Sequence, residues 1–147
     1  MRKLFIYYSL SENGDTVAKY LSKKGIETRK VITKDKMPKS MFFRILTGGF
    51  LAGINHKAKL INFNNSVEEY DEIIIGSPIW NGKLSCAINS VLDELNLEDK
   101  EVKFVLYSGS GAAPKAEKLI KETYKDSEII NLKEPKKNKQ ELEKISL

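Results

Sequence analysis

The sequence predicts an α/β domain built around a parallel sheet, because three observations agree. Five short apolar runs, rich in Ile, Val, Phe and Tyr, alternate with segments of helical periodicity, and this alternation is typical of βαβ units. The 147 residues suffice for one hydrophobic core and are few for two. The hydrophobic fraction of 41% and the charged fraction of 31% are those of a folded domain. We therefore expect one domain over residues 1–147.

The apolar runs that predict strands have the β-branched and aromatic composition that pleated sheets favour. In chain order they cover residues 4–8, 26–32, 73–75 with their flanks, 102–107 and 129–132. The third and fourth runs are almost continuously apolar. We expect these two strands to be covered on both faces of the sheet, as parallel strands usually are.

Apolar stripes predict the helices between these strands. The strongest stripe repeats at i, i+3, i+4 and i+7, and weaker stripes predict two more helices and a short closing helix in the tail that starts at Lys136. The members, in order of strength, are Ile88, Val91, Leu92 and Leu95; Val17, Tyr20 and Leu21; Ala116, Leu119 and Ile120; Leu142 and Ile145. Gly25 follows the first helix where a helix would end. Cys86 begins the strongest helix, where a thiol pKa can fall, although a small structural residue is the favoured interpretation.

Residues 37–59 interrupt the alternation. They contain an apolar cluster and the pair Gly48-Gly49, which together suggest an amphipathic helix followed by a turn or loop. The favoured interpretation is a buried crossover helix. A flap beside a ligand, a self-association surface and a basic helix on a membrane surface are the alternatives. His56 lacks a partner at metal-ligand spacing, so we expect a surface or capping role for it.

Charge, apolar run length and cysteine content indicate which ligands and which cellular compartment to expect. The net charge is +5, but residues 1–59 carry 13 basic and 4 acidic side chains, whereas residues 60–147 carry 12 and 16. The basic part could attract a phosphate-bearing ligand, an acidic partner or nucleic acid, or could simply be a solvated surface. The apolar runs are shorter than a membrane helix or signal peptide needs, and one cysteine cannot form an internal disulfide. We expect a cytoplasmic protein that engages neither membrane nor nucleic acid.

Three loops follow expected strands, at the edge of the sheet where open α/β folds bind ligands. The first holds Ser9, Leu10, Ser11, Glu12, Asn13, Gly14, Asp15 and Thr16 and leads into a helix. Hydroxyl groups and free N–H groups at a helix N-terminus favour an anion. The loop lacks the glycine and lysine pattern of triphosphate and dinucleotide loops, so a monophosphate fits better. Ordinary helix capping is the alternative.

The second and third loops offer a flat apolar face and a close backbone approach. The second holds Ser77, Pro78, Ile79, Trp80, Asn81 and Gly82, and the third holds Ser108, Gly109, Ser110 and Gly111. Trp80 could present its face to a planar ring, although a lone tryptophan is more often part of a core. The glycines of the third loop let the backbone approach a ligand, and a flexible connection is the alternative there.

The three loops together make the chain similar to the flavodoxin family from end to end. The resemblance lies in the Ser-x-Ser opening at Ser9 and Ser11, the run DEIIIGSPIW at 71–80, and the Ser-Gly-Ser-Gly loop at 108–111. The spacing is closest to short-chain flavodoxin-like proteins of low-GC bacteria. The resemblance implies a doubly wound, five-stranded parallel sheet of order 2-1-3-4-5 with helices on both faces. It also implies bound flavin mononucleotide (FMN) and electron transfer with redox protein partners, by a monomer or weak homodimer.

The resemblance also implies roles for residues. The phosphate loop of the family falls on Ser9, Ser11, Glu12, Asn13 and Gly14, with Glu12 where Gly is usual and Gly14 where Thr is usual. A carboxylate would repel the phosphate, so we expect Glu12 to point to solvent. The aromatic residue beside the flavin falls on Trp80, the flexible peptide on Asn81-Gly82, and the third flavin loop on 108–111. No side chain is expected to act as a catalytic base or nucleophile, and no metal is expected.

Two other functions remain open from the sequence. One is an enzyme of the same fold, a reductase of FMN or quinones that depends on NAD(P)H, although no nicotinamide site is recognisable. The other is a cofactor-free binding module that uses the basic segment for an acidic protein or nucleic acid.

Overall fold

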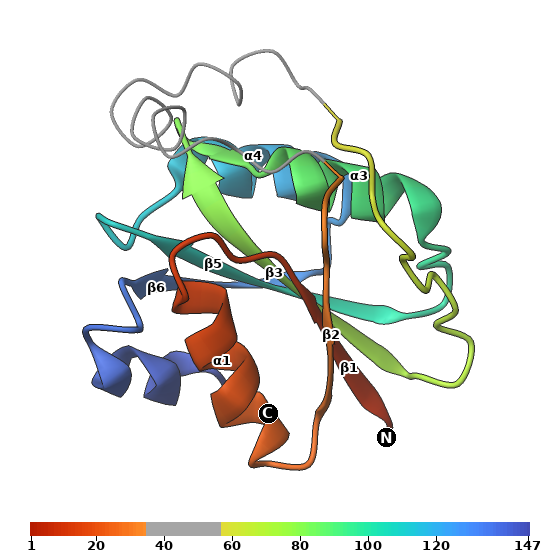
Figure 1. The fold of residues 1–147 in the computed structure, drawn as a ribbon, viewed down its shortest axis with the longest axis horizontal. Helices are drawn as coiled ribbons and strands as arrows, with labels where there is room; N and C mark the ends of the chain where they lie inside the picture. Colours follow the sequence, from red (N-terminus) through yellow and green to blue (C-terminus); the bar gives the residue numbers. More distant parts are fainter. Residues whose placement is uncertain (35–56) are drawn as a thin grey trace.

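The computed structural model describes residues 1–34 and 57–147 and shows a parallel sheet with helices on both faces (Figure 1). The parallel strands are β1 (Lys3–Tyr7), β2 (Glu27–Lys30), β3 (Glu72–Trp80), β5 (Glu101–Ser108) and β6 (Glu128–Lys133). Their order across the sheet is β2-β1-β3-β5-β6. This order confirms the predicted doubly wound arrangement: β2 is added on one side of β1, whereas β3, β5 and β6 are added on the other.

Helices cover the sheet from two sides. The helix α1 (Asn13–Ser22) and the 3-10 helix η2 (Lys139–Lys144) lie on one face, and α3 (Cys86–Glu94) and α4 (Pro114–Thr123) lie on the other (Figure 1). The predicted closing helix is therefore a 3-10 helix and not an α-helix. Leu142 of this helix and Ile145, which directly follows it, are both buried and lie three positions apart, the spacing that brings side chains into line in a 3-10 turn.

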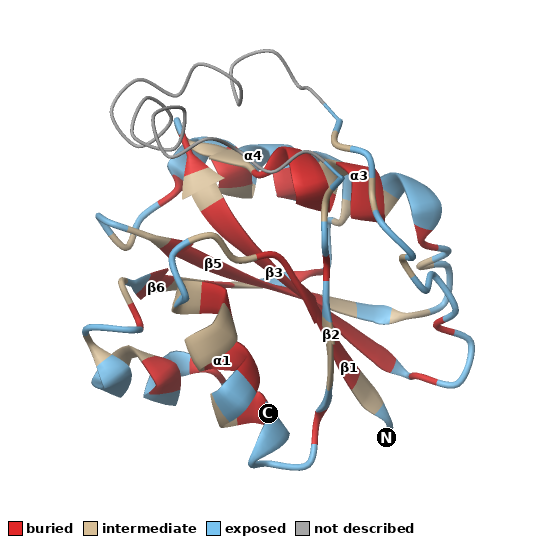
Figure 2. Cartoon of the chain, viewed as in Figure 1, coloured by how far each residue is buried: buried red, intermediate tan, exposed pale blue. Residues whose placement is uncertain are grey.

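The core is divided into two layers by the sheet, as Figure 2 shows. Ile73 and Ile75 of β3 pack into the layer under α3 and α4, while Ile74 packs into the layer under α1. β5 alternates in the same way, with Phe104 and Val105 in opposite layers. The prediction that these strands are covered on both faces is confirmed.

Strand β3 is longer than the sequence predicts. Residues Gly76 to Trp80, expected as a loop, continue the strand to Trp80, and a hairpin then returns through β4 (Lys83–Leu84), which pairs antiparallel with β3. Asn81 and Gly82 form the turn, with φ of 49° and 74°. Positive φ at both central residues is what a type I′ hairpin turn requires, and Asn-Gly supplies it at little cost.

Two smaller corrections concern Ile32 and Leu119, which are exposed in the structure although the sequence predicts them within a strand and on a buried helix stripe. The second strand covers only Glu27–Lys30, and Ile32, expected within it, is exposed. Leu119, expected on a buried stripe, is 50% exposed, because only Ala116 and Ile120 of α4 face the sheet. The predictions for residues 37–56, including His56, lie outside the described residues. None of the described helices combines the length and apolarity that crossing a bilayer requires.

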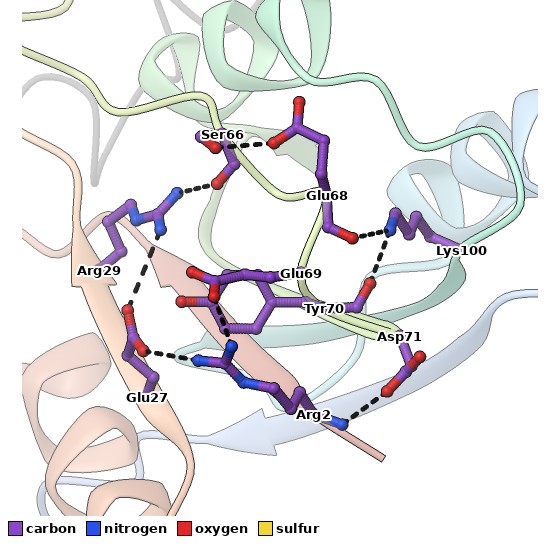
Figure 3. Close-up of polar contacts among 9 residues, drawn as sticks. All are labelled: Arg2, Glu27, Arg29, Ser66, Glu68, Glu69, Tyr70, Asp71 and Lys100. Carbon is purple, nitrogen blue, oxygen red and sulfur yellow. Dashed lines mark hydrogen bonds and ion pairs between the residues drawn. The ribbon is translucent and has the colours of Figure 1, made fainter.

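Charged residues crowd the amino-terminal edge of the strands, where Figure 3 shows nine residues joined by polar contacts, seven of them charged. The guanidinium groups of Arg2 and Arg29 lie 5.0 and 5.9 Å from the centre of the Tyr70 ring. Lys100 Nζ donates to the Tyr70 carbonyl at 2.7 Å, and the Arg2 backbone N–H donates to Asp71 Oδ2 at 2.7 Å. These contacts bind the segment before β3 to the start of β1 and to the residue before β5.

Candidate functional site

The carboxyl ends of β1, β3 and β5 surround a cavity of about 370 Å³. Each of the three predicted loops contributes to its wall, and so does a fourth segment near residue 136. The lining residues, segment by segment, are Leu10, Ser11 and Asn13; Pro78, Ile79 and Trp80; Tyr107, Ser108 and Gly109; Glu134, Lys136 and Lys137. Folding therefore brings loops that are about 70 and 100 residues apart in sequence to one site.

The first loop folds back on itself before α1 begins. The Gly14 N–H donates to Ser9 Oγ at 3.1 Å, and the Thr16 hydroxyl donates to the Glu12 carbonyl at 2.9 Å. Ser9 and Thr16 thus shape the loop, whereas Ser11 and Asn13 line the cavity and are joined by a 3.2 Å hydrogen bond. The first N–H groups of an α-helix have no carbonyl acceptor within the helix. They make the start of α1 a site for an anion.

Gly14 has a packing reason to lack a side chain. A Cβ at this position would lie 2.5 Å from Tyr107 Oη and 2.8 Å from Ser9 Cβ. Tyr107 is buried and donates its hydroxyl to the Tyr8 carbonyl, and burial raises the pKa of this phenol well above its usual value. The Tyr107 hydroxyl occupies the space that threonine would need, which explains why glycine stands where threonine was expected.

Glu12 adopts the left-handed conformation, with φ of 62°, the region that favours glycine. Its side chain is 64% exposed and forms an ion pair with Lys136. The expectation that this carboxylate points outward agrees with that exposure. The sequence did not predict the lysine that neutralises it.

Asp15 takes no part in the cavity wall. Its carboxylate accepts hydrogen bonds from Lys30 Nζ at 2.7 Å and from the Tyr7 hydroxyl at 3.1 Å. Burial, with the nearby Asp15 charge, raises the pKa of Tyr7 to about 12. These contacts join α1 to β1 and β2, so the structure gives Asp15 a scaffolding position.

Trp80 ends β3 and is 5% exposed, yet it contributes to the cavity wall together with Pro78 and Ile79. Its ring meets the Tyr8 ring edge-on, with centroids 6.1 Å apart and planes at 80°. Edge-to-face contact of this kind fixes ring orientation. Ser77, by contrast, is fully buried and accepts the Ser85 N–H at 3.1 Å, so it supports the start of α3 and not the cavity.

The third loop is a compact turn. Ser108 Oγ accepts the Gly111 N–H at 3.0 Å, and Gly111 has φ of 74°. Ser110 Oγ accepts the Ala112 N–H at 3.3 Å. Ser108 and Gly109 line the cavity, whereas Ser110 and Gly111 shape the turn beside it.

Cys86, the first residue of α3, is buried. Burial raises the pKa of its thiol, so the helix start does not lower it, and the structural interpretation of this residue is supported.

Within residues 1–34 and 57–147, no cluster of three or more His, Cys, Asp or Glu side chains could hold a metal ion.

The fourth wall comes from the turn that follows β6. The Glu134 N–H donates to the Ser108 carbonyl at 3.0 Å, and the Lys136 N–H donates to Asn13 Oδ1 at 3.1 Å. Lys137 Nζ pairs with Glu134 at 2.8 Å. Local sequence patterns carry no signal for these contacts, because 124 residues separate Glu12 from Lys136.

One cavity thus combines an anion site, an apolar aromatic wall and close-approaching backbone. FMN has a phosphate group and a flat ring, and these residues fit both. Ser11, Asn13 and the N-terminus of α1 would hold the phosphate. Trp80, Pro78 and the backbone of Gly109 would hold the ring.

Comparison with known proteins gives an independent result. A family model described as NADPH-dependent FMN reductase matches residues 1–136. A search of curated protein sequences found no match. Among solved structures, a protein from Bacteroides eggerthii described as a flavoprotein is similar with a TM-score of 0.73 and 16% identity, over 99% of this chain and 98% of that one.

Two further structures place the fold. A flavoprotein from Lactobacillus acidophilus, solved in complex with FMN, has a TM-score of 0.60 and 19% identity, covering 95% of this chain and 97% of that one. A flavodoxin from the domain Archaea has a TM-score of 0.50 and 14% identity, covering 97% and 90%. The predicted flavodoxin-like fold is confirmed. The finer resemblance to short-chain flavodoxins is not, because the family model that matches is that of a reductase.

Proposed function

The chain belongs to the NADPH-dependent FMN reductase family, and from this premise we propose that it is a reductase that passes electrons from NADPH through bound FMN to a small acceptor. FMN is its cofactor. The sequence analysis favoured an electron-transfer protein. The family match across residues 1–136 supports a reductase instead. The carrier, with its redox protein partners, remains the second candidate.

The cavity supports cofactor binding through its two kinds of surface. The start of α1, with Ser11 and Asn13, favours the negative phosphate. Trp80 is fixed in orientation by Tyr8 and offers an apolar surface to a planar ring. When bound, FMN would supply the two-electron redox chemistry between NADPH and the acceptor. The protein would bind the cofactor, orient its ring and exclude water from it.

The hairpin turn at Asn81-Gly82 directly follows Trp80 of this wall, and both of its residues have positive φ. Gly82 has φ of 74°, and its nearest non-neighbouring atoms belong to the flexible side chain of Lys115. A peptide in such a turn can rotate at low cost. We infer that this turn adjusts to the flavin ring as its protonation changes, the role that the flavodoxin resemblance assigned to it.

The decisive experiment is anaerobic reduction of the FMN-loaded protein by NADPH alone. We expect the flavin absorbance near 450 nm to bleach within seconds, and bleaching by NADPH in the absence of any second protein would establish the reductase. A protein that binds FMN and is bleached by dithionite but not by NADPH or NADH would be an electron carrier. Failure to bind FMN at micromolar concentration would exclude both.

The same preparation tests the aromatic wall. We expect Trp80→Ala to weaken FMN binding by about tenfold or more, since a lost aromatic contact is worth about 1 kcal/mol beyond its buried area. Cys86→Ala removes a buried side chain that does not line the cavity, so its affinity should match that of the wild type. Circular dichroism checks that both variants are folded. Equal affinities in the two variants would refute the stacking role of Trp80.

A further inference from the structure

The ion pair between Glu12 and Lys136 places a cation at the one loop whose charge is unfavourable for a phosphate. Glu12 immediately precedes α1, beside the anion site, and its carboxylate carries a negative charge there. The negative charge of Glu12 at the start of α1 repels the two negative charges of a phosphate group. Something must compensate for it if the site binds FMN through its phosphate.

Lys136 is held at this loop by two contacts. Its backbone N–H donates to Asn13 Oδ1 at 3.1 Å, and its ammonium group contacts the Glu12 carboxylate. The turn that carries it is fixed to the third loop, because the Glu134 N–H donates to the Ser108 carbonyl at 3.0 Å. Lys136 therefore lines the same cavity as Ser11 and Asn13 in a defined position.

We propose that Lys136 is a phosphate ligand of the cofactor site, and that Glu12 holds its ammonium group in place before the cofactor arrives. The proposal rests on the proposed function, since it assumes bound FMN. A lysine side chain offers three N–H donors, so one ammonium group can serve Glu12 and a phosphate oxygen together. The turn at 134–138 is then a part of the cofactor site that comes from the opposite end of the sequence.

The test compares FMN with riboflavin, which carries the same ring and lacks the phosphate. Binding is measured by quenching of flavin fluorescence, so no enzyme activity is needed. We expect the wild type to prefer FMN over riboflavin, and Lys136→Gln to weaken FMN binding by about tenfold, the effect of one charge-assisted hydrogen bond. Riboflavin affinity should stay unchanged. The control is Lys144→Gln, because Lys144 is likewise exposed, pairs with Glu141 at 2.7 Å and does not line the cavity.

A double-mutant cycle separates a ligand from a mere neutraliser of Glu12. If Lys136 contacts the phosphate, Lys136→Gln still weakens FMN binding when residue 12 is Gln. If Lys136 only cancels the Glu12 charge, the double variant binds FMN as tightly as Glu12→Gln alone, and the proposal is wrong.

Other outcomes are equally clear. A parallel loss of riboflavin and FMN affinity in Lys136→Gln would mean that the lysine only supports the fold, and would overturn the proposal. Equal affinity of the wild type for FMN and riboflavin would overturn it too, while leaving flavin binding intact. Binding of neither flavin would instead contradict the proposed function itself.

Discussion

Replacing Gly14 with alanine tests how tightly the first loop is built against the core. The added Cβ would lie 2.5 Å from Tyr107 Oη and 2.8 Å from Ser9 Cβ. Tyr107 cannot easily yield, because it is buried on β5 and its hydroxyl donates to the Tyr8 carbonyl. The substitution therefore forces either the ring or the start of α1 to move.

The expected cost follows from three contributions. Overpacking a filled interior costs about 1–3 kcal/mol, and losing the buried Tyr107 hydrogen bond costs about 1–3 kcal/mol. Alanine regains about 1 kcal/mol of helix propensity over glycine. We expect Gly14→Ala to lower the free energy of unfolding by about 3 kcal/mol, a large part of the stability of a domain of this size.

Urea denaturation of the flavin-free protein, followed by circular dichroism, measures this change. Gly109→Ala is the matched control, because a Cβ there meets nothing within 4 Å and the backbone has no positive φ. The double variant Gly14→Ala/Tyr107→Phe removes the hydroxyl that causes the clash, so its loss should fall short of the sum of the single losses by at least about 1 kcal/mol. Additive losses, or a Gly14→Ala variant as stable as the control, would refute this reasoning.

Three further predictions concern the turn at Gly82, the thiol of Cys86 and the dependence of stability on low pH. Gly82→Ala should cost about 1 kcal/mol, because φ of 74° is unfavourable for a residue with a Cβ; thermal denaturation measures it, and an unchanged midpoint would argue against the turn. Cys86 should react slowly with a thiol reagent such as DTNB in the folded protein and quickly in urea, because burial raises its pKa and limits access. The hydrogen bond from Ser146 and the nearby Lys103 lower the pKa of Glu128. The ionised carboxylate therefore contributes fully to the free energy of unfolding above its ordinary pKa of about 4.5, and this contribution is lost as the pH falls through the lowered pKa. The difference in unfolding free energy between wild type and Glu128→Gln should therefore shrink below about pH 4, by a small amount because this side chain is 49% exposed.

The sequence predicted the parallel strands and the helices on both faces of the sheet because both leave local signals. Alternating runs and stripes gave every parallel strand, and the flavodoxin resemblance supplied their order. The length of β3 was missed because Gly76 and Pro78 were interpreted as the end of a strand. In the structure, β1 stops pairing at Gly76, so β3 has a free edge at Pro78 and a missing N–H costs little there. Asn81-Gly82 was a readable hairpin signal.

The candidate site was predicted in part. Ser11, Asn13 and Trp80 line the cavity, whereas Asp15 is bound to Lys30 on the neighbouring strand. No pattern within a single segment could separate these positions, because hydroxyl and carboxylate groups at a helix start serve capping, scaffolding and ligands alike.

The turn after β6 was not foreseen because its contacts are entirely non-local. Lys136 meets Glu12 and Asn13 only once β6 has joined the sheet beside β5. The tail was interpreted as a short helix from the spacing of two apolar residues, and that spacing reports packing against the sheet. It carries no information about the polar turn before it.

The contact between Glu12 and Lys136 also sets an order of events during synthesis on the ribosome. Strand β1 leaves the ribosome first, but the wall at 134–138 joins it only after all of the residues between them have been made. A growing chain that ends before residue 134 contains β1, β3 and β5 and lacks this lysine. If Lys136 binds the flavin phosphate as proposed, tight capture of FMN requires a chain made past its last parallel strand, so the cofactor stabilises these longer chains in preference to shorter ones.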